Sequence, residues 1–171
     1  MTARSVRQSY LLAAVLVAVV AIWWLLGDDP EARVRQAHAE LADLVSRTQD
    51  QSDAGLSVLQ LRRLEAMFAA SLSVSGDADN LVGNYSPQEI VALVVRAHSA
   101  FDRVELRFGE ITVEFPEEAL AVARFSASLD AVETAGDEVS GDAVTETRAV
   151  ESRMRDIDGE WQFVSFTLTR P

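Results

Sequence analysis

The feature that most constrains this chain is an unbroken apolar run near its N-terminus, from Leu11 to Leu26. With Tyr10 and Gly27 the stretch has eighteen residues. An α-helix of that length spans about 27 Å, at ~1.5 Å per residue. Because the hydrocarbon core of a bilayer is about 30 Å thick, residues 10–27 are predicted to form one transmembrane anchor.

The residues beside this run predict its orientation. Arg4 and Arg7 precede it without any acid, whereas Asp28 and Asp29 follow it. The positive-inside rule then places residues 1–9 in the cytoplasm as a short tail and residues 28–171 outside as an exported domain. Aromatic side chains at the two ends of the run are expected at the membrane interfaces: Tyr10, Trp23 and Trp24.

A cleaved signal peptide is the alternative interpretation of the same run. Such peptides have a shorter apolar core and a cleavage site of small residues. Here the run ends in bulky Trp and Leu residues, and the A-x-A match at Ala37–Ala39 lies well beyond it, inside a helical pattern. An uncleaved anchor is favoured, and the domain is exported in either case.

Composition narrows the location and the partners. The net charge of the chain is −12, and removing the two positive charges of Arg4 and Arg7 leaves −14 for the exported part. So acidic a domain repels nucleic acid, which excludes nucleic-acid binding. The chain has no cysteine, and all 15 basic residues are arginine, a bias typical of GC-rich bacterial genomes. We therefore expect a single-pass protein of the bacterial inner membrane with a periplasmic domain.

Helical patterns come first in the exported part. Asp29 and Pro30 are typical of a helix start, and apolar residues recur at helical spacing as far as Val45. A second helix is predicted over residues 56–70, followed by a short strand at 71–75 and a loop at 76–84. Ser86 to Glu89 form a capping box with proline at the first helical position, which predicts a third helix to about residue 101.

Strand patterns follow. Hydrophobic residues alternate with polar ones over 103–108 and 111–115, and longer strands are predicted over 120–132, 144–157 and 161–169. Asp158-Gly159 is a strong signal for a tight hairpin between the last two. Helices followed by a meander of strands predict an α+β domain, with the helices packed on one face of an antiparallel sheet.

The stretch from Ser152 to Phe163 (SRMRDIDGEWQF) resembles the closing hairpin of the NTF2-like, or SnoaL-like, superfamily. The stretch from Phe68 to Asp77 resembles the family's passage from helix to first strand. The resemblance covers residues 31–170 and implies a cone of about three helices on a curved, mostly antiparallel sheet. The family includes isomerases, dehydratases, transport adaptors and secretion scaffolds, so the resemblance does not decide activity.

Candidate catalytic residues are few. His98 and Asp102 are spaced i, i+4 on the predicted third helix and could form a general-base pair, although a solvated helix face gives the same pattern. His38 stands alone on the first helix, without a sequence neighbour that could act as its partner. The histidines and acids do not have metal-ligand spacing, so neither a metal nor a cofactor is expected. Candidates for lining a ligand pocket are Phe68, Tyr85 and Trp161.

Two functions are compatible with these patterns. The favoured one is a membrane-tethered, non-catalytic domain that binds a ligand or a protein on the periplasmic side. Its partner would be a second copy, paired through the sheet, or another envelope protein. The alternative is a tethered isomerase-like enzyme with an apolar pocket and His98 or a carboxylate as base. A cone filled by phenylalanine and tryptophan would argue against the enzyme.

Overall fold

The computed structural model describes residues 29–47, 56–77, 81–133 and 143–171. Residues Val34–Pro171 form one compact unit. The predicted anchor, with Tyr10, Trp23 and Trp24, lies outside the described residues. Among the helices that the structure describes, none is long and apolar enough to cross a bilayer.

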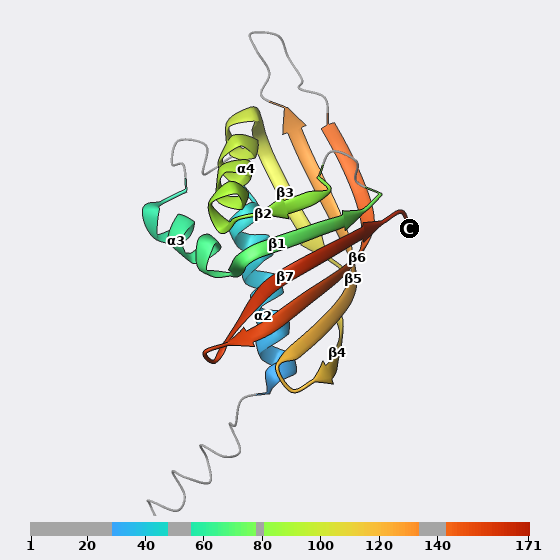
Figure 1. Ribbon diagram of the computed structural model, residues 1–171. Helices are drawn as coiled ribbons and strands as arrows, with labels where there is room; N and C mark the ends of the chain where they lie inside the picture. Colours follow the sequence, from blue (N-terminus) through green and yellow to red (C-terminus); the bar gives the residue numbers. More distant parts are fainter. Residues whose placement is uncertain (1–28, 48–55, 78–80, 134–142) are drawn as a thin grey trace, which may run out of the picture. The chain divides into compact units, whose positions relative to one another are not determined.

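The described part contains three helices (Figure 1), α2 (Pro30–Val45), α3 (Val58–Ala66) and α4 (Pro87–Ala100). The capping box predicted for α4 is confirmed, with Ser86 and Glu89 bonded reciprocally. The prediction that the second helix reaches residue 70 was wrong. Met67 ends it, because its carbonyl accepts the N–H of Phe163 (2.9 Å) and the following residues pair with the last strand.

One curved sheet accompanies the helices (Figure 1), with strand order β2-β1-β7-β6-β5-β3 and β4 paired to β5. All its strand pairs are antiparallel except β1 with β7. The loop predicted for residues 76–84 was partly wrong, since its end forms β2. The strands are β1 (Phe68–Gly76), β2 (Gly83–Tyr85), β3 (Phe101–Phe108), β4 (Thr112–Glu117), β5 (Leu120–Glu133), β6 (Ala143–Ile157) and β7 (Glu160–Thr169).

The predicted hairpin between β6 and β7 is confirmed. Asp158 and Gly159 both have positive φ, 55° and 86°. Positive φ at both central residues is what a type I′ turn requires, and Asp-Gly supplies it at low cost. This turn fixes the register of the two strands, with Ile157 opposite Glu160.

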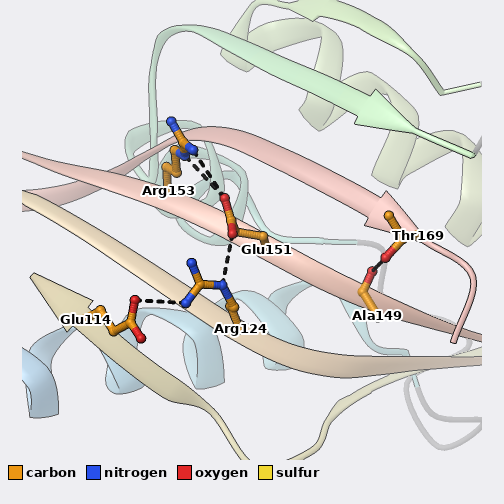
Figure 2. Close-up of polar contacts among 6 residues, drawn as sticks. All are labelled: Glu114, Arg124, Ala149, Glu151, Arg153 and Thr169. Carbon is orange, nitrogen blue, oxygen red and sulfur yellow. Dashed lines mark hydrogen bonds and ion pairs between the residues drawn. The ribbon is translucent and has the colours of Figure 1, made fainter. Parts of the chain in front are cut away.

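The sheet has an apolar inner face, which packs against α2, and a polar outer face. The inner face forms one core with Val34, Leu41 and Leu44 of α2. On the outer face (Figure 2), Arg124 donates to Glu114 (2.8 Å) and Glu151 (3.0 Å). The predicted α+β architecture, helices on a curved sheet, is therefore confirmed.

Candidate functional site

A histidine–serine pair lies at the centre of the core. His38, on α2, and Ser152, on β6, have no solvent exposure. The His38 Nδ1 lies 2.7 Å from the carbonyl oxygen of Val34, and its Nε2 lies 2.7 Å from the Ser152 Oγ. Since a carbonyl can only accept, Nδ1 carries the proton, and the Ser152 hydroxyl donates to Nε2. The prediction that His38 has no partner was wrong.

Three phenylalanine rings enclose this histidine. Each meets the imidazole edge-on, with centroid distances of 4.9 Å for Phe163, 5.0 Å for Phe125 and 6.1 Å for Phe108. Burial lowers the pKa of His38 below its ordinary value, and the hydrogen bond to Val34 opposes part of that shift. The imidazole is therefore neutral at physiological pH.

A neutral imidazole that accepts a serine proton is the arrangement of a general base and its nucleophile. Catalysis also requires that a substrate reach the hydroxyl. Ser152 has no exposed surface, and the aromatic rings occupy the space beside the imidazole. The pair therefore satisfies two buried polar groups and closes the interior of the cone.

The predicted pair of His98 and Asp102 is not a helical pair. α4 ends at Ala100, and Phe101 already has extended backbone (φ −124°, ψ 135°), so Asp102 belongs to β3. In the described part of the chain no hydrogen bond joins the two side chains. The His98 Nε2 instead donates to the carbonyl of Val45 (2.7 Å), which holds the end of α2 against α4.

His98 and Asp102 do share a surface cleft of about 520 Å³. Its other walls come from the end of α2 and from α3 and α4. Because Nε2 donates to a helix carbonyl, the ring is held at the wall of the cleft with Nδ1 as its acceptor nitrogen, and the predicted partner Asp102 does not bond to it. The remaining lining residues are Arg47, Leu56, Leu61, Val95 and Ser99.

The three residues predicted to line a pocket lie in different places. Phe68 is buried in the core, with its ring 5.9 Å from that of Phe163. Trp161 is also buried and meets the edge of the Phe115 ring at 5.8 Å. Tyr85 is on β2, where its hydroxyl donates to the carbonyl of Leu81 (3.0 Å). None of the three lines the cleft beside His98, and none lines the second cavity, at the end of α2.

A second cavity, of about 540 Å³, opens where the inner face runs beyond the end of α2. We call it the mouth cavity. Six apolar residues line it: Val45, Leu81, Leu106, Ala127, Leu129 and Leu168. Four charged residues complete it: Asp77, Glu146, Arg148 and Arg170.

Sequence reasoning missed Arg148 and Ser152. A signal for both was present, because alternate residues of a strand share one face. Arg148 and Ser152 have the same parity on β6 as the buried Val150 and Met154. This parity places a guanidinium and a hydroxyl on the inner face.

No protein-family model matches the sequence, and no curated protein matches it. Solved structures do match the fold. The Kfla4162 protein of Kribbella flavida superimposes with a TM-score of 0.63 at 13% identity, over 81% of this chain and 88% of that one. A proposed scytalone dehydratase from Novosphingobium aromaticivorans gives 0.59 at 13% identity, over 81% and 82%.

A proposed dehydratase of the NTF2-like family from Streptomyces avermitilis gives a TM-score of 0.59 at 10% identity, over 82% of this chain and 95% of that one. Identities this low establish the fold and not the activity. The described domain therefore has the NTF2-like cone fold that the closing hairpin indicated.

Proposed function

We propose that this domain is a non-catalytic binding module that holds a small, largely apolar molecule in the mouth cavity. The observation that carries the proposal is the filled interior of the cone. His38, Ser152 and three phenylalanine rings occupy the depth where a substrate would have to sit. Below the mouth cavity, the inner face of the sheet is covered by packed side chains.

The size and lining of the mouth cavity fit this role. Sites for small molecules are commonly about 300–1,000 Å³, mostly apolar, with a few polar groups that fix orientation. The mouth cavity, at about 540 Å³, has six apolar and four charged lining residues. A ligand would bury its apolar part against Leu106, Leu129 and Leu168.

The membrane tether remains part of the proposal. Residues 10–27 would hold the domain at the periplasmic face of a bacterial inner membrane. Pairing with a second copy through the sheet, or with another envelope protein, would use the polar outer face. Exposed groups such as Arg124 and Arg153 supply hydrogen-bonding capacity there.

One observation favours the alternative of a tethered enzyme. The tautomer of His38 leaves Nε2 as a proton acceptor, as a general base requires. Such an enzyme would need the phenylalanine cluster to open around Ser152. A serine-reactive fluorophosphonate would then label Ser152 in the full chain under native conditions. We expect no labelling, and stoichiometric modification of Ser152 would establish the enzyme.

The binding proposal is tested by photolabelling the full chain in a neutral maltoside detergent. The probe is a decanol derivative with a diazirine in its chain, and labelled peptides are located by mass spectrometry. We expect label on β3, β5 and β6 residues of the mouth cavity. Labelling of residues 10–27 reports partitioning of the probe into the detergent shell and serves as the internal reference.

Two variants make this experiment decisive. Ala127→Phe places a ring in the mouth cavity and should reduce cavity labelling relative to the internal reference. Ser128→Phe, the next residue on β5, faces the opposite side of the sheet and should leave labelling unchanged. Leu129→Trp at the rim provides a second blocking variant. Cavity labelling that persists in both blocking variants would overturn the proposal.

A further inference from the structure

We infer that the ligand of the mouth cavity carries a single negative charge, a carboxylate on an apolar body, and that Arg148 is the residue that holds it. This inference rests on the proposed function and specifies its ligand. The apolar lining favours a ligand with an apolar body, and the two arginines of the cavity favour an anionic headgroup.

Arg148 is placed where a headgroup could reach it. It lies on the inner face of β6, opposite Ala127 of β5 and two residues from the buried Val150. Its side chain is 22% exposed, so it is largely removed from water at the edge of an apolar cavity. A hydrogen bond from a charged donor is stronger in such a setting than on an open surface.

Much of the hydrogen-bonding capacity of Arg148 is unused. Its Nε and Nη2 both approach the same oxygen of Glu146, with the Nε at 2.7 Å. Within the described residues, Nη1 has no hydrogen-bond partner. A guanidinium has five N–H donors in a planar fork, which can bind a carboxylate through two parallel hydrogen bonds.

A second arginine lies beside the first. Thr169 of β7 pairs with Ala149 of β6, and Figure 2 shows the Thr169 hydroxyl donating to the backbone carbonyl of Ala149. Arg148 precedes Ala149 on β6, Arg170 follows Thr169 just past the end of β7, and both arginines line the mouth cavity. Like charges in such positions repel one another, and an anion between them would relieve that repulsion.

The acids of the cavity define the charge of the ligand. Glu146 and Asp77 balance the two arginines, so the four charges sum to zero. The Asp77 carboxylate accepts the backbone N–H of Arg170 (3.3 Å), and Glu146 is bound to Arg148. With a carboxylate bound, the four charges and the ligand would sum to −1, whereas a dianion such as a phosphate monoester would bring the sum to −2 beside the two carboxylates, so the monoanion is favoured.

The acidic surface of the domain opposes this binding at long range. At physiological ionic strength, however, charges more than about 8 Å apart are largely screened. A carboxylate in contact with a partly buried guanidinium is screened much less. The contact between the carboxylate and the guanidinium therefore decides whether an anionic ligand binds more tightly than a neutral one. This difference in affinity should depend on Arg148.

The inference is tested by competition against the neutral diazirine probe on the full chain, at pH 8 in the same detergent. Decanoate, decanol and decyltrimethylammonium share one chain length and differ in the head. We expect decanoate to displace the probe from the mouth cavity at a concentration at least about tenfold lower than decanol. This ratio is what the absence of one hydrogen bond between charged groups would cost decanol. Decyltrimethylammonium should be the weakest competitor.

Variants of β6 test whether the stronger competition by decanoate depends on Arg148. Arg148→Gln should abolish the preference for decanoate. Arg153→Gln, on the outer face of the same strand and also paired with a glutamate, should preserve it. Glu146→Gln releases the Arg148 guanidinium and should strengthen decanoate competition, a gain that misfolding cannot produce.

The outcomes separate the two proposals. Equal competition by decanoate and decanol, or a preference that survives Arg148→Gln, would refute the carboxylate inference while leaving binding at the mouth intact. Labelling of the mouth cavity that no competitor displaces and that Ala127→Phe does not reduce would refute the binding proposal itself.

Discussion

Removing the Ser152 hydroxyl should destabilise the domain through the buried histidine. Ser152→Ala leaves the His38 Nε2 as an acceptor without a donor, at a site with no solvent exposure. An unsatisfied buried polar group costs about 1–3 kcal/mol. The hydroxyl is small, so the cavity contributes little. The expected loss in free energy of unfolding is therefore about 1–3 kcal/mol, or several degrees in Tm.

A double-mutant cycle isolates the hydrogen bond from packing. His38→Leu keeps a side chain of similar size among the three phenylalanine rings but leaves the Ser152 hydroxyl without its acceptor. Replacing both partners by apolar groups of similar shape can be nearly neutral. The double variant should thus lose less stability than the sum of the single variants, by about 1–2 kcal/mol.

The assay is urea unfolding of a fragment comprising residues 29–171, followed by tryptophan fluorescence at pH 8. Trp161 is the only tryptophan in this fragment and is buried, so it reports loss of the core. Ser128→Ala on the outer face is the control and should change stability by less than about 0.5 kcal/mol. Additive effects of the two core substitutions, or a negligible loss in Ser152→Ala, would refute the assigned hydrogen bond.

Further outcomes follow from the same structure. Fragment 29–171 should be soluble and unfold cooperatively, whereas an aggregated product would contradict an independent domain. Burial lowers the folded-state pKa of His38 from 6.5, so the unfolded chain binds more protons below that pH. Stability should fall as pH drops from about 6.5 towards the folded-state pKa, and His38→Leu should flatten that slope. Gly76→Ala should cost more than Gly159→Ala. Both glycines have positive φ, but a Cβ at residue 76 would also clash with the backbone of Leu168. Denaturation curves should therefore show the larger loss of stability for Gly76→Ala. His98→Ala should lower Tm, because it releases the Val45 carbonyl, yet photolabelling of the mouth cavity should persist, and complete loss of that labelling would return His98 to the site.

The elements that could be predicted are those whose signal is local. Val104, Leu106 and Phe108 alternate with charged residues, and that period alone defines β3 and its inner face. The Asp158-Gly159 turn and the Ser86 capping box are equally local, because each depends on hydrogen bonds or φ values within four residues. Such features need no knowledge of the rest of the fold.

Non-local pairing explains what was missed. β2 has three residues, too few for any periodicity, and forms because Leu72 to Val74 provide a strand edge. β1 extends into the predicted second helix because it pairs in parallel with β7, near the other end of the chain. His38 and Ser152 are 114 residues apart, so no spacing rule connects them.

The lengths of the elements explain why a cavity forms at the mouth and not at the centre. α2 has 16 residues, or about 24 Å at ~1.5 Å each. β5 and β6 have 14 and 15 residues, or roughly 46–50 Å at ~3.3 Å each. A helix of half the strand length cannot cover the whole inner face. α2 ends at Val45, which lines the mouth cavity.

Beyond that point the inner face of β6 changes from Val150 to Arg148 and Glu146, so the uncovered part of the strand has charged side chains where the covered part has apolar ones. The histidine–serine pair complements this arrangement, because its directional hydrogen bonds fix α2 at one position along the sheet. A leucine in place of His38 could pack equally well after a small slide of the helix, and such a slide would move Val45 across the mouth. On this argument the buried pair sets the opening of the cavity without touching a ligand.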